Sequence, residues 1–241
     1  MNEQMQMPPA EQLDIDAYLA DVNSKIADKK VLEKISALQK ENDFKKLSEQ
    51  YAKLDKPLAV AYYAVKFAEQ KNSVEEYVKA GDYNSLLIQT APDDKARNYL
   101  SENRIACYEK AVALDSTKTE NRIRLAGAYM EAGGPPMRGV SMLLDIVKTD
   151  SNNIDAQLML ARFDGISGQF EKAIPRYRKI LYLAPLNEEA LAGLEQAYEA
   201  TGNIPKAIET LEQYKKILKD AESKRKVDEY IRQLKDSGKP Q

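Results

Sequence analysis

The chain has 241 residues, of which 43% are hydrophobic and 31% charged, a composition that supports a hydrophobic core and excludes wholesale disorder. Lys and Arg number 36 against 38 Asp and Glu, so the net charge of −2 provides no global field that would attract nucleic acid or an anionic membrane. There is no histidine and only one cysteine, Cys107, which removes the commonest general base and zinc ligand and excludes an intrachain disulfide.

The N-terminal part of the chain is predicted to be a tail followed by helices. Residues 1–12 contain neither a basic start nor an apolar run, so we expect a disordered tail and no secretory signal. Residues 13–41 carry apolar side chains at helical spacing, including Leu19, Val22 and Ile26, which predicts one or two helices. The pattern leaves open whether this segment packs with the rest of the chain or acts as a lid.

Long helices are predicted over most of the remaining chain, because Gly and Pro number only ten each in the sequence. The helical spacing and an internal repeat group these helices into hairpins. The first hairpin is expected over residues 43–71. An irregular unit follows over 73–115 with about nine residues too many for a regular hairpin, so its register stays open. Regular hairpins are expected over 119–149, 154–184 and 188–218.

The last two hairpins repeat one another. Gly168 and Ala173 recur 34 residues later as Gly202 and Ala207. The glycine is expected to end the first helix of each hairpin in the left-handed conformation, which it adopts without a steric penalty. The alanine is expected to let the two helices of the hairpin approach closely.

Some positions depart from this pattern. Asp164 stands where the last hairpin has Tyr198, and Arg104 stands where a second helix usually has a small residue. Asp55 occupies the turn of the first hairpin, and Gly133 is expected to end the first helix of the 119–149 hairpin.

The 34-residue period, the Gly-Ala-Tyr pattern and the Pro185 stop after a second helix resemble the tetratricopeptide repeat (TPR) family. The resemblance is strong over about 119–219 and weaker over 43–116, and no repeat has the Trp of that family. It implies an all-α fold: a right-handed superhelical solenoid of antiparallel helix hairpins, with N-terminal helices and a C-terminal capping helix. The last helix fits the capping role because it has one apolar and one charged face.

The domain organisation that follows has five parts. They are a disordered tail at 1–12, an N-terminal helical extension at 13–41, a TPR-like repeat array at 42–219, a C-terminal capping helix at 220–236 and a frayed tail at 237–241.

The candidate binding surface follows from the resemblance, since the first helices of successive TPR hairpins line a concave groove. The groove lining expected here is apolar and soft in its centre, with two arginines that can pair with a ligand carboxylate. The candidate groove residues are Ile123, Arg124, Met130, Leu158, Met159, Arg162, Ile166 and Gln196.

The functional prediction is a protein–protein interaction module or scaffold that binds a peptide or amphipathic helix in the concave groove. No combination of nucleophile, base and orienting group occurs, so we expect no enzyme, no catalytic residue, no cofactor and no metal site. Two alternatives stay open: a homo-oligomeric structural or assembly protein whose groove is self-covered, and a regulatory subunit of an enzyme.

The expected partner is another protein, with a homodimer as the alternative, and neither nucleic acid binding nor membrane insertion is expected. No stretch reaches the roughly 18 consecutive apolar residues that a membrane helix needs. We therefore expect a cytoplasmic protein. An exported or membrane-anchored protein whose signal or anchor is not part of this chain remains the alternative.

Overall fold

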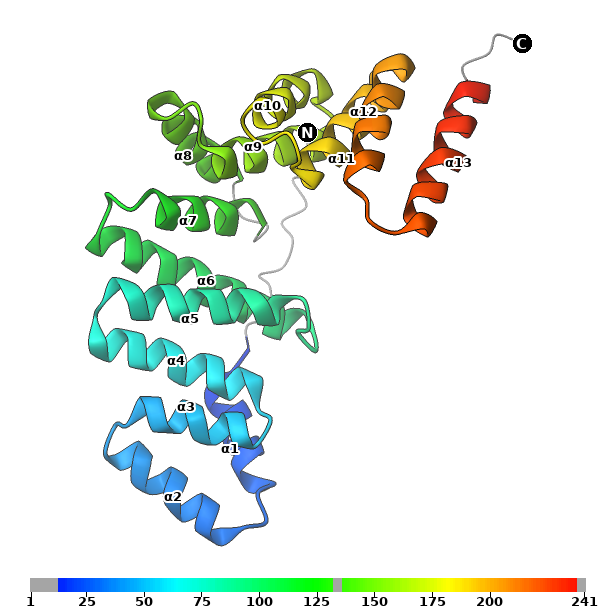
Figure 1. Ribbon diagram of the computed structural model, residues 1–241. Coiled ribbons are helices and arrows are strands. Elements are labelled where there is room, and N and C mark those ends of the chain that lie inside the picture. Colours follow the sequence, from blue (N-terminus) through cyan, green and yellow to red (C-terminus); the bar gives the residue numbers. More distant parts are fainter. Residues whose placement is uncertain (1–12, 132–135, 238–241) are drawn as a thin grey trace, which may run out of the picture. The chain divides into compact units, whose positions relative to one another are not determined.

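The computed structural model describes residues 13–131 and 136–237, and these ranges are helical, with no strand (Figure 1). The prediction of an all-α fold is confirmed. The tail predicted at 1–12, most of the tail predicted at 237–241 and the turn glycine Gly133 lie outside the described residues.

Thirteen helices occur within the described ranges. They are α1 (Ile15–Ser24), α2 (Lys29–Lys40), α3 (Phe44–Lys53), α4 (Pro57–Lys71), α5 (Val74–Ile88), α6 (Asp94–Leu114), α7 (Thr119–Glu131), α8 (Pro136–Thr149), α9 (Ile154–Ile166), α10 (Phe170–Leu183), α11 (Glu188–Ala200), α12 (Ile204–Ile217) and α13 (Ala221–Ser237). The chain divides into two compact units, unit 1 up to Gly139 and unit 2 from Val140, and each is described by itself.

The N-terminal helices belong to the core of unit 1. Leu19 and Val22 of α1 are buried in one cluster with Ile35 of α2 and Leu47 of α3. The Tyr51 hydroxyl of α3 also donates a hydrogen bond of 2.9 Å to the side-chain oxygen of Asn23. Residues 13–41 therefore pack with the hairpins and are not a detached lid.

The irregular unit is a single hairpin with long helices. Helices α5 and α6 have 15 and 21 residues and pack against each other, whereas α9 and α10 have 13 and 14. The surplus of about nine residues is therefore taken up by additional helical turns. Asp93 begins α6 by accepting a hydrogen bond of 2.8 Å from the Ala96 backbone N–H.

Side-chain caps set where the regular hairpins begin. The side-chain oxygen of Asn153 accepts from the Ala156 backbone N–H at 3.0 Å, and that of Asn187 accepts from Ala190 at 2.8 Å. Both asparagines satisfy a backbone donor that the first helical turn leaves without a partner. The cap therefore recurs with the repeat.

Left-handed residues end the first helices of three hairpins, as predicted for the two glycines. Gly168 and Gly202 have φ values of 71° and 72°, and Asp55 has a φ of 53°. The residue after each of them returns its N–H to a carbonyl in the last helical turn, as Asn203 does to Tyr198 at 2.8 Å. Asp tolerates the left-handed region better than most residues, so it replaces glycine in the first hairpin.

Small residues let the helices of a hairpin approach closely. Ala173 and Ala207 are completely buried. At the matching position of α8, a Cβ added to Gly139 would lie 2.3 Å from the Ala126 carbonyl oxygen of α7. Even alanine would require a backbone shift there, because the clash is with backbone and not with a flexible side chain.

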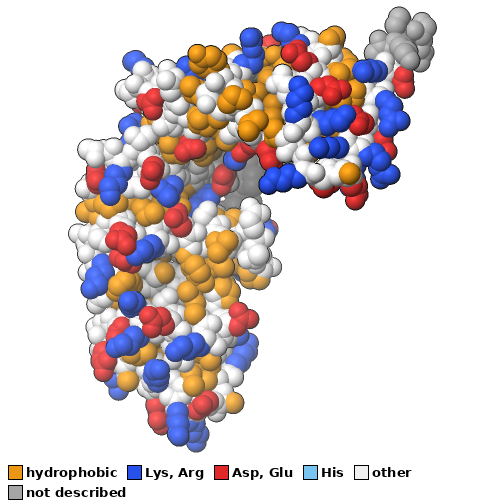
Figure 2. Space-filling view, in the orientation of Figure 1, with side chains coloured by type: hydrophobic (Ala, Val, Ile, Leu, Met, Phe, Trp, Pro, Cys, Tyr) orange, Lys and Arg blue, Asp and Glu red, His pale blue; other side chains and the backbone are white. Residues whose placement is uncertain are grey.

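Helix α13 packs on α12 through one face. Ile231 and Leu234 of α13 are buried with Leu211 of α12. Charged side chains of both signs cover the side of α13 that is visible in Figure 2. An apolar side against α12 and a charged side toward water is the pattern that closes a stack of hairpins.

Candidate functional site

Five of the predicted groove residues lie on first helices of unit 2. Met159, Arg162 and Ile166 are three and four residues apart and therefore lie on one side of α9. On α11, which packs against α9, Glu189 and Gln196 are two turns apart on one side. The guanidinium of Arg162 contacts the Glu189 carboxylate and joins the two sides. We call these five residues the α9/α11 face.

The residues of the α9/α11 face differ in exposure. Ile166 has 88% of its surface exposed, which is unusual for a large aliphatic side chain. Arg162 and Gln196 are also exposed, and Met159 is half-buried. Leu158, the fifth predicted residue of unit 2, is half-buried and packs against the core cluster of this unit. It therefore contributes to the core.

The arginine of this face already has a partner. Arg162 and Glu189 are each about half exposed, at 49% and 44% of their side chains. A pair that is this accessible to water adds only about 0.2–1 kcal/mol to stability. A ligand carboxylate can therefore replace Glu189 at a small cost.

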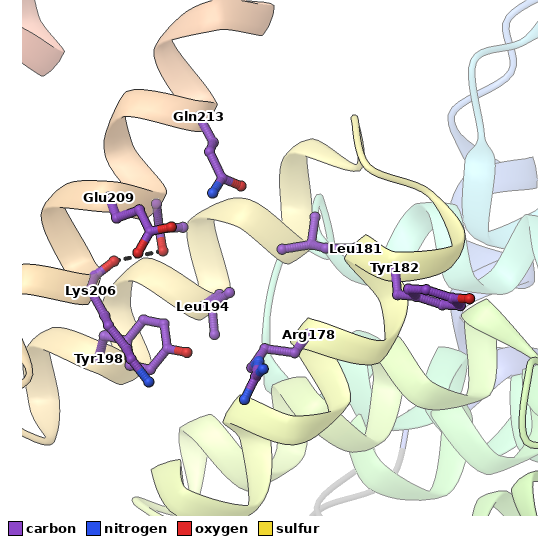
Figure 3. Close-up of a pocket in the computed structure, with 9 residues that line it drawn as sticks. Arg178, Leu181, Tyr182, Leu194, Tyr198, Lys206, Glu209 and Gln213 are labelled. Atoms are coloured by element: carbon purple, nitrogen blue, oxygen red, sulfur yellow. Dashed lines mark hydrogen bonds between the residues drawn. The ribbon is translucent and has the colours of Figure 1, made fainter.

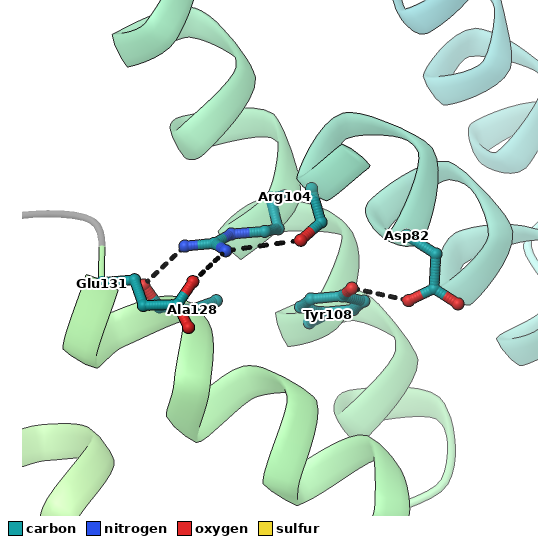
Figure 4. A network of polar contacts seen from close by, with 6 residues as sticks. Asp82, Arg104, Tyr108, Ala128 and Glu131 are labelled. Carbon is teal, nitrogen blue, oxygen red and sulfur yellow. Dashed lines mark hydrogen bonds and ion pairs between the residues drawn. The ribbon is translucent and has the colours of Figure 1, made fainter. Parts of the chain in front are cut away.

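The other three predicted groove residues lie on α7 in unit 1, and all three are half-buried: Ile123, Arg124 and Met130. Arg124 Nε lies 3.4 Å from the Asp82 carboxylate of α5 and so also has an intrachain partner. Asp82 in addition accepts a hydrogen bond of 2.6 Å from the Tyr108 hydroxyl of α6 (Figure 4). Burial raises the pKa of Tyr108, and the bond to Asp82 raises it further.

Arg104, which departs from the repeat pattern, lies at the centre of a polar network in unit 1 (Figure 4). It is only 4% exposed. Its guanidinium donates to the Glu131 carboxylate at 2.8 Å, to the Ala128 carbonyl oxygen at 3.2 Å and to the Ser85 hydroxyl at 3.5 Å. These contacts join α6 to α5 and α7, so the buried arginine serves packing between helices.

Asp164, the second departure, is also satisfied within unit 2. Its carboxylate pairs with Arg176 Nε of α10 at 2.9 Å, and Arg176 Nη1 donates to the Gln157 side chain at 3.1 Å. A polar residue at this buried position is retained because a charged partner on the next helix compensates it.

A carboxyl group that the sequence pattern does not predict lies between α11 and α13. Burial, and then the neighbouring Glu199, raises the pKa of Glu195 to about 7. Its buried Oε1 atom has no hydrogen-bond partner among the described residues. Glu199 instead accepts from the Tyr230 hydroxyl of α13 at 2.5 Å. The only signal in the sequence was the like-charged pair four residues apart.

A second missed feature is a hollow of about 340 Å³ between α10, α11 and α12, which we call the α10/α12 hollow (Figure 3). Its lining combines apolar, cationic and neutral polar side chains with one carboxylate. The lining residues are Arg178, Leu181, Tyr182, Leu194, Tyr198, Lys206, Glu209, Thr210 and Gln213.

Reactive groups are scarce in the described part of the chain. The Cys107 thiol is buried, and burial raises its pKa to about 12, so almost no thiolate forms near neutral pH. Over residues 13–131 and 136–237, no group of three His, Cys, Asp or Glu side chains is placed to hold a metal ion. No described helix is both long and apolar enough to cross a bilayer.

Comparisons with known proteins agree with this architecture. Residues 166–226 match the family model of the tetratricopeptide repeat. A crystal structure of MamA is 22% identical over 75% of this chain and 97% of that one, with a TM-score of 0.54. YrrB, described as a TPR protein with an unusual peptide-binding site, is 14% identical over 88% of this chain and 98% of that one, with a TM-score of 0.52. The comparison with curated proteins gives no match.

Identities this low establish a shared fold and nothing about ligands. Within that limit, the match shows tetratricopeptide repeats over residues 166–226, and the hairpins with their recurring left-handed turns confirm an all-α, TPR-type fold.

Proposed function

We propose that the protein is a protein–protein interaction module that binds a peptide or amphipathic helix of another protein on the α9/α11 face. The observation that carries the proposal is Ile166, a large aliphatic side chain that is 88% exposed at the end of α9. It shares its side of the helix with half-buried Met159, whose flexible thioether adapts to ligands of different shape. Burying one isoleucine on binding contributes about 2 kcal/mol.

The ion pair on this face would orient the bound peptide or helix. Arg162 and Glu189 are both accessible, so an incoming carboxylate can take the guanidinium while Glu189 is released to water or to a cationic ligand group. Exposed charges of this kind change the rate and salt dependence of association more than its final affinity. An apolar anchor beside an exchangeable ion pair is typical of helix or peptide recognition.

A binding role also fits the chemistry of the chain. The sequence has no histidine, and the only thiol is buried with a raised pKa. The TPR-type fold exposes the sides of its first helices, and YrrB, which has the same fold, is described as having a peptide-binding site. These points favour recognition of another protein over catalysis by this chain.

The test compares two exposed aliphatic positions of unit 2. Ile166→Glu places a charge on the α9/α11 face, and Leu186→Glu places the same charge at a residue that is 71% exposed in the turn after α10. Affinity capture from a lysate of the source cells, read by mass spectrometry, should recover a protein with the wild type and with Leu186→Glu but not with Ile166→Glu. Circular dichroism checks that all three proteins are folded.

Other outcomes separate the alternatives. If the wild type recovers only itself, and light scattering shows a mass that rises with concentration and falls in Ile166→Glu, the face is covered by a second copy. Equal recovery of the same partners by all three proteins would contradict a role for the α9/α11 face.

A further inference from the structure

The α10/α12 hollow lies on a different side of unit 2 from the α9/α11 face. Leu194 and Tyr198, which line the hollow, point roughly 140–180° around α11 from Glu189, since successive helical residues turn by about 100°. The other walls are α10 and α12, the second helices of consecutive hairpins (Figure 3). The hollow is therefore independent of the face in the proposed function.

The base of the hollow is apolar. Leu194 and Tyr198 are buried, and Leu181 is half-buried. Tyr182 stands on the rim with 83% of its surface exposed. In Figure 3 its ring points away from Leu181 and Leu194, so it covers a ligand side chain in the hollow only after a change of rotamer, which its exposure permits. Rigid aromatic groups contribute strongly when an interface buries them. The volume of about 340 Å³ is at the lower end of the range for binding pockets, about 300–1,000 Å³.

The charges around the hollow are predominantly positive. Arg178 has no hydrogen bond or ion pair to any part of the chain that the structure describes, in contrast to Arg162 and Arg176 of the same unit. Lys206 likewise has no described carboxylate partner, and its Nζ lies 5.4 Å from the centre of the Tyr198 ring. Glu209 is the single carboxylate in the lining.

The cations and the carboxylate occupy different ends of the hollow. In Figure 3 the Arg178 and Lys206 side chains extend from opposite walls toward the end where the Tyr198 ring lies. Glu209 and Gln213 lie toward the other end. A ligand carboxylate at the first end would face two cations, and a ligand side chain between the ends would lie on Leu181 and Leu194.

We infer that the α10/α12 hollow is a second docking site, and that it accepts a short acidic segment of a partner protein in which a leucine-sized aliphatic side chain is flanked by carboxylates. The carboxylate pairs with Arg178 and Lys206, the aliphatic group fills the base, and the Tyr182 ring closes over it. Charge complementarity selects this occupant, because a basic segment would meet two cations, and a purely acidic one would leave the apolar base unfilled.

The test uses three fluorescent pentapeptides and measures anisotropy. The first has one leucine flanked on each side by two glutamates, the second replaces the glutamates by lysines, and the third replaces the leucine by serine. The wild-type protein should bind the first, and bind the second and third at least about ten-fold more weakly. Methyl signals of Leu181 and Leu194 should shift in NMR spectra when the first peptide binds.

Charge-reversal variants locate the site. Arg178→Glu and Lys206→Glu should each weaken binding of the first peptide by about ten-fold, and Glu209→Gln should strengthen it. Lys172→Glu is the matched control, since it reverses an exposed charge on α10 outside the lining and should leave binding unchanged. Circular dichroism of each variant excludes unfolding as the cause.

Three results would overturn the inference. They are no binding of the first peptide up to about 1 mM, equal binding of all three peptides, and equal loss in Lys172→Glu and Arg178→Glu. None of them depends on Ile166, so the proposed function and this inference can fail separately. A mass that doubles in the wild type but not in Arg178→Glu would identify a second copy as the occupant and would also contradict the assigned partner.

Discussion

Both units press a tyrosine ring against a glycine, but they hold the ring differently. In unit 1 a Cβ added to Gly81 would lie 2.5 Å from Cε1 of Tyr108, whose hydroxyl is bonded to Asp82. In unit 2 a Cβ added to Gly193 would lie 2.3 Å from Cζ of Tyr177, whose hydroxyl has no hydrogen bond to a described residue. The two contacts are similarly close, so the cost of replacing either glycine by alanine depends on whether the tyrosine ring can move.

The carboxylates that hold tyrosine hydroxyls differ in the same way between the units. Asp82, the partner of Tyr108, also lies 3.4 Å from Arg124, which balances its charge. Glu199, the partner of Tyr230, instead has Glu195 beside it, and this second carboxyl group provides no counter-charge. In unit 1 the ring against the glycine is therefore anchored at a carboxylate whose charge is balanced by Arg124. In unit 2 the ring against the glycine has no such anchor among the described residues, and the carboxylate that holds Tyr230 has a like-charged neighbour.

The largest effect is expected from Gly81→Ala. The new methyl group meets one edge of a ring that is anchored at its hydroxyl, so either the backbone must shift or the Tyr108–Asp82 hydrogen bond must break. We expect a loss of about 3 kcal/mol in the free energy of unfolding, the upper end for overpacking a core. Urea denaturation measures the loss, and an unchanged midpoint would show that Tyr108 is free to move.

Releasing the ring should reduce that cost. In a Tyr108→Phe background the ring has no hydroxyl to hold it, so Gly81→Ala should cost only about 1 kcal/mol. A double-mutant cycle of the two substitutions should then show a coupling free energy of about 2 kcal/mol. Tyr108→Phe alone should cost about 1 kcal/mol for the lost hydrogen bond. Strictly additive single and double variants would contradict the anchoring of Tyr108 by Asp82.

A smaller effect is expected from Gly193→Ala. The contact is with the far end of the Tyr177 side chain, which has no hydrogen bond to give up among the described residues. The gain in helix propensity from Gly to Ala, about 1 kcal/mol, offsets part of the crowding. The net loss should be about 1 kcal/mol by urea denaturation, and a loss as large as that of Gly81→Ala would remove the distinction between the units.

The smallest effect concerns pH. Because the pKa of Glu195 rises from its ordinary value of 4.5 to about 7 in the fold, the folded protein binds the proton more tightly than the unfolded chain does. This contribution to stability is complete below the unfolded pKa and is lost as the pH rises through about 7. Since Glu195 is only half-buried, solvent screening should limit the change to less than about 1 kcal/mol.

The measurement is the stability of the wild type and of Glu195→Gln between about pH 5 and pH 8. Glu195→Gln should remove this part of the pH dependence. At the high end of the pH range the variant should be more stable relative to the wild type than it is at the low end. Hydrogen exchange of the α13 amides should report the same trend, because α13 supplies Tyr230 to this cluster. A variant with the same pH profile as the wild type would contradict the role of Glu195.

The repeat and its small residues could be predicted from the sequence because they depend on spacing along one helix. Gly168, Gly202 and Ala173 recur at a fixed period, and the side of α9 that carries Met159, Arg162 and Ile166 follows from helical geometry. The pairing of Arg162 with Glu189 could not be predicted in this way, since it depends on the distance and rotation between α9 and α11.

The same limit explains the features that were missed. Arg104 and Glu131 are 27 residues apart, and nothing in the local pattern couples them. The α10/α12 hollow exists because three helices leave a space that their side chains do not fill, which no single helix reveals. Leu158 is half-buried, and its contact with the core cluster depends on neighbouring helices, which the register along α9 does not reveal.

The burial of Cys107 has a practical consequence. The chain has one cysteine, and it lies in α6 of unit 1 with its thiol shielded and protonated near neutral pH. A thiol-reactive reagent should therefore label the native protein only when α6 opens. The labelling rate then measures local unfolding of unit 1 and does not report on unit 2. A cysteine introduced at an exposed position would react much faster than Cys107. A probe can therefore be attached to the introduced cysteine without removing the natural one.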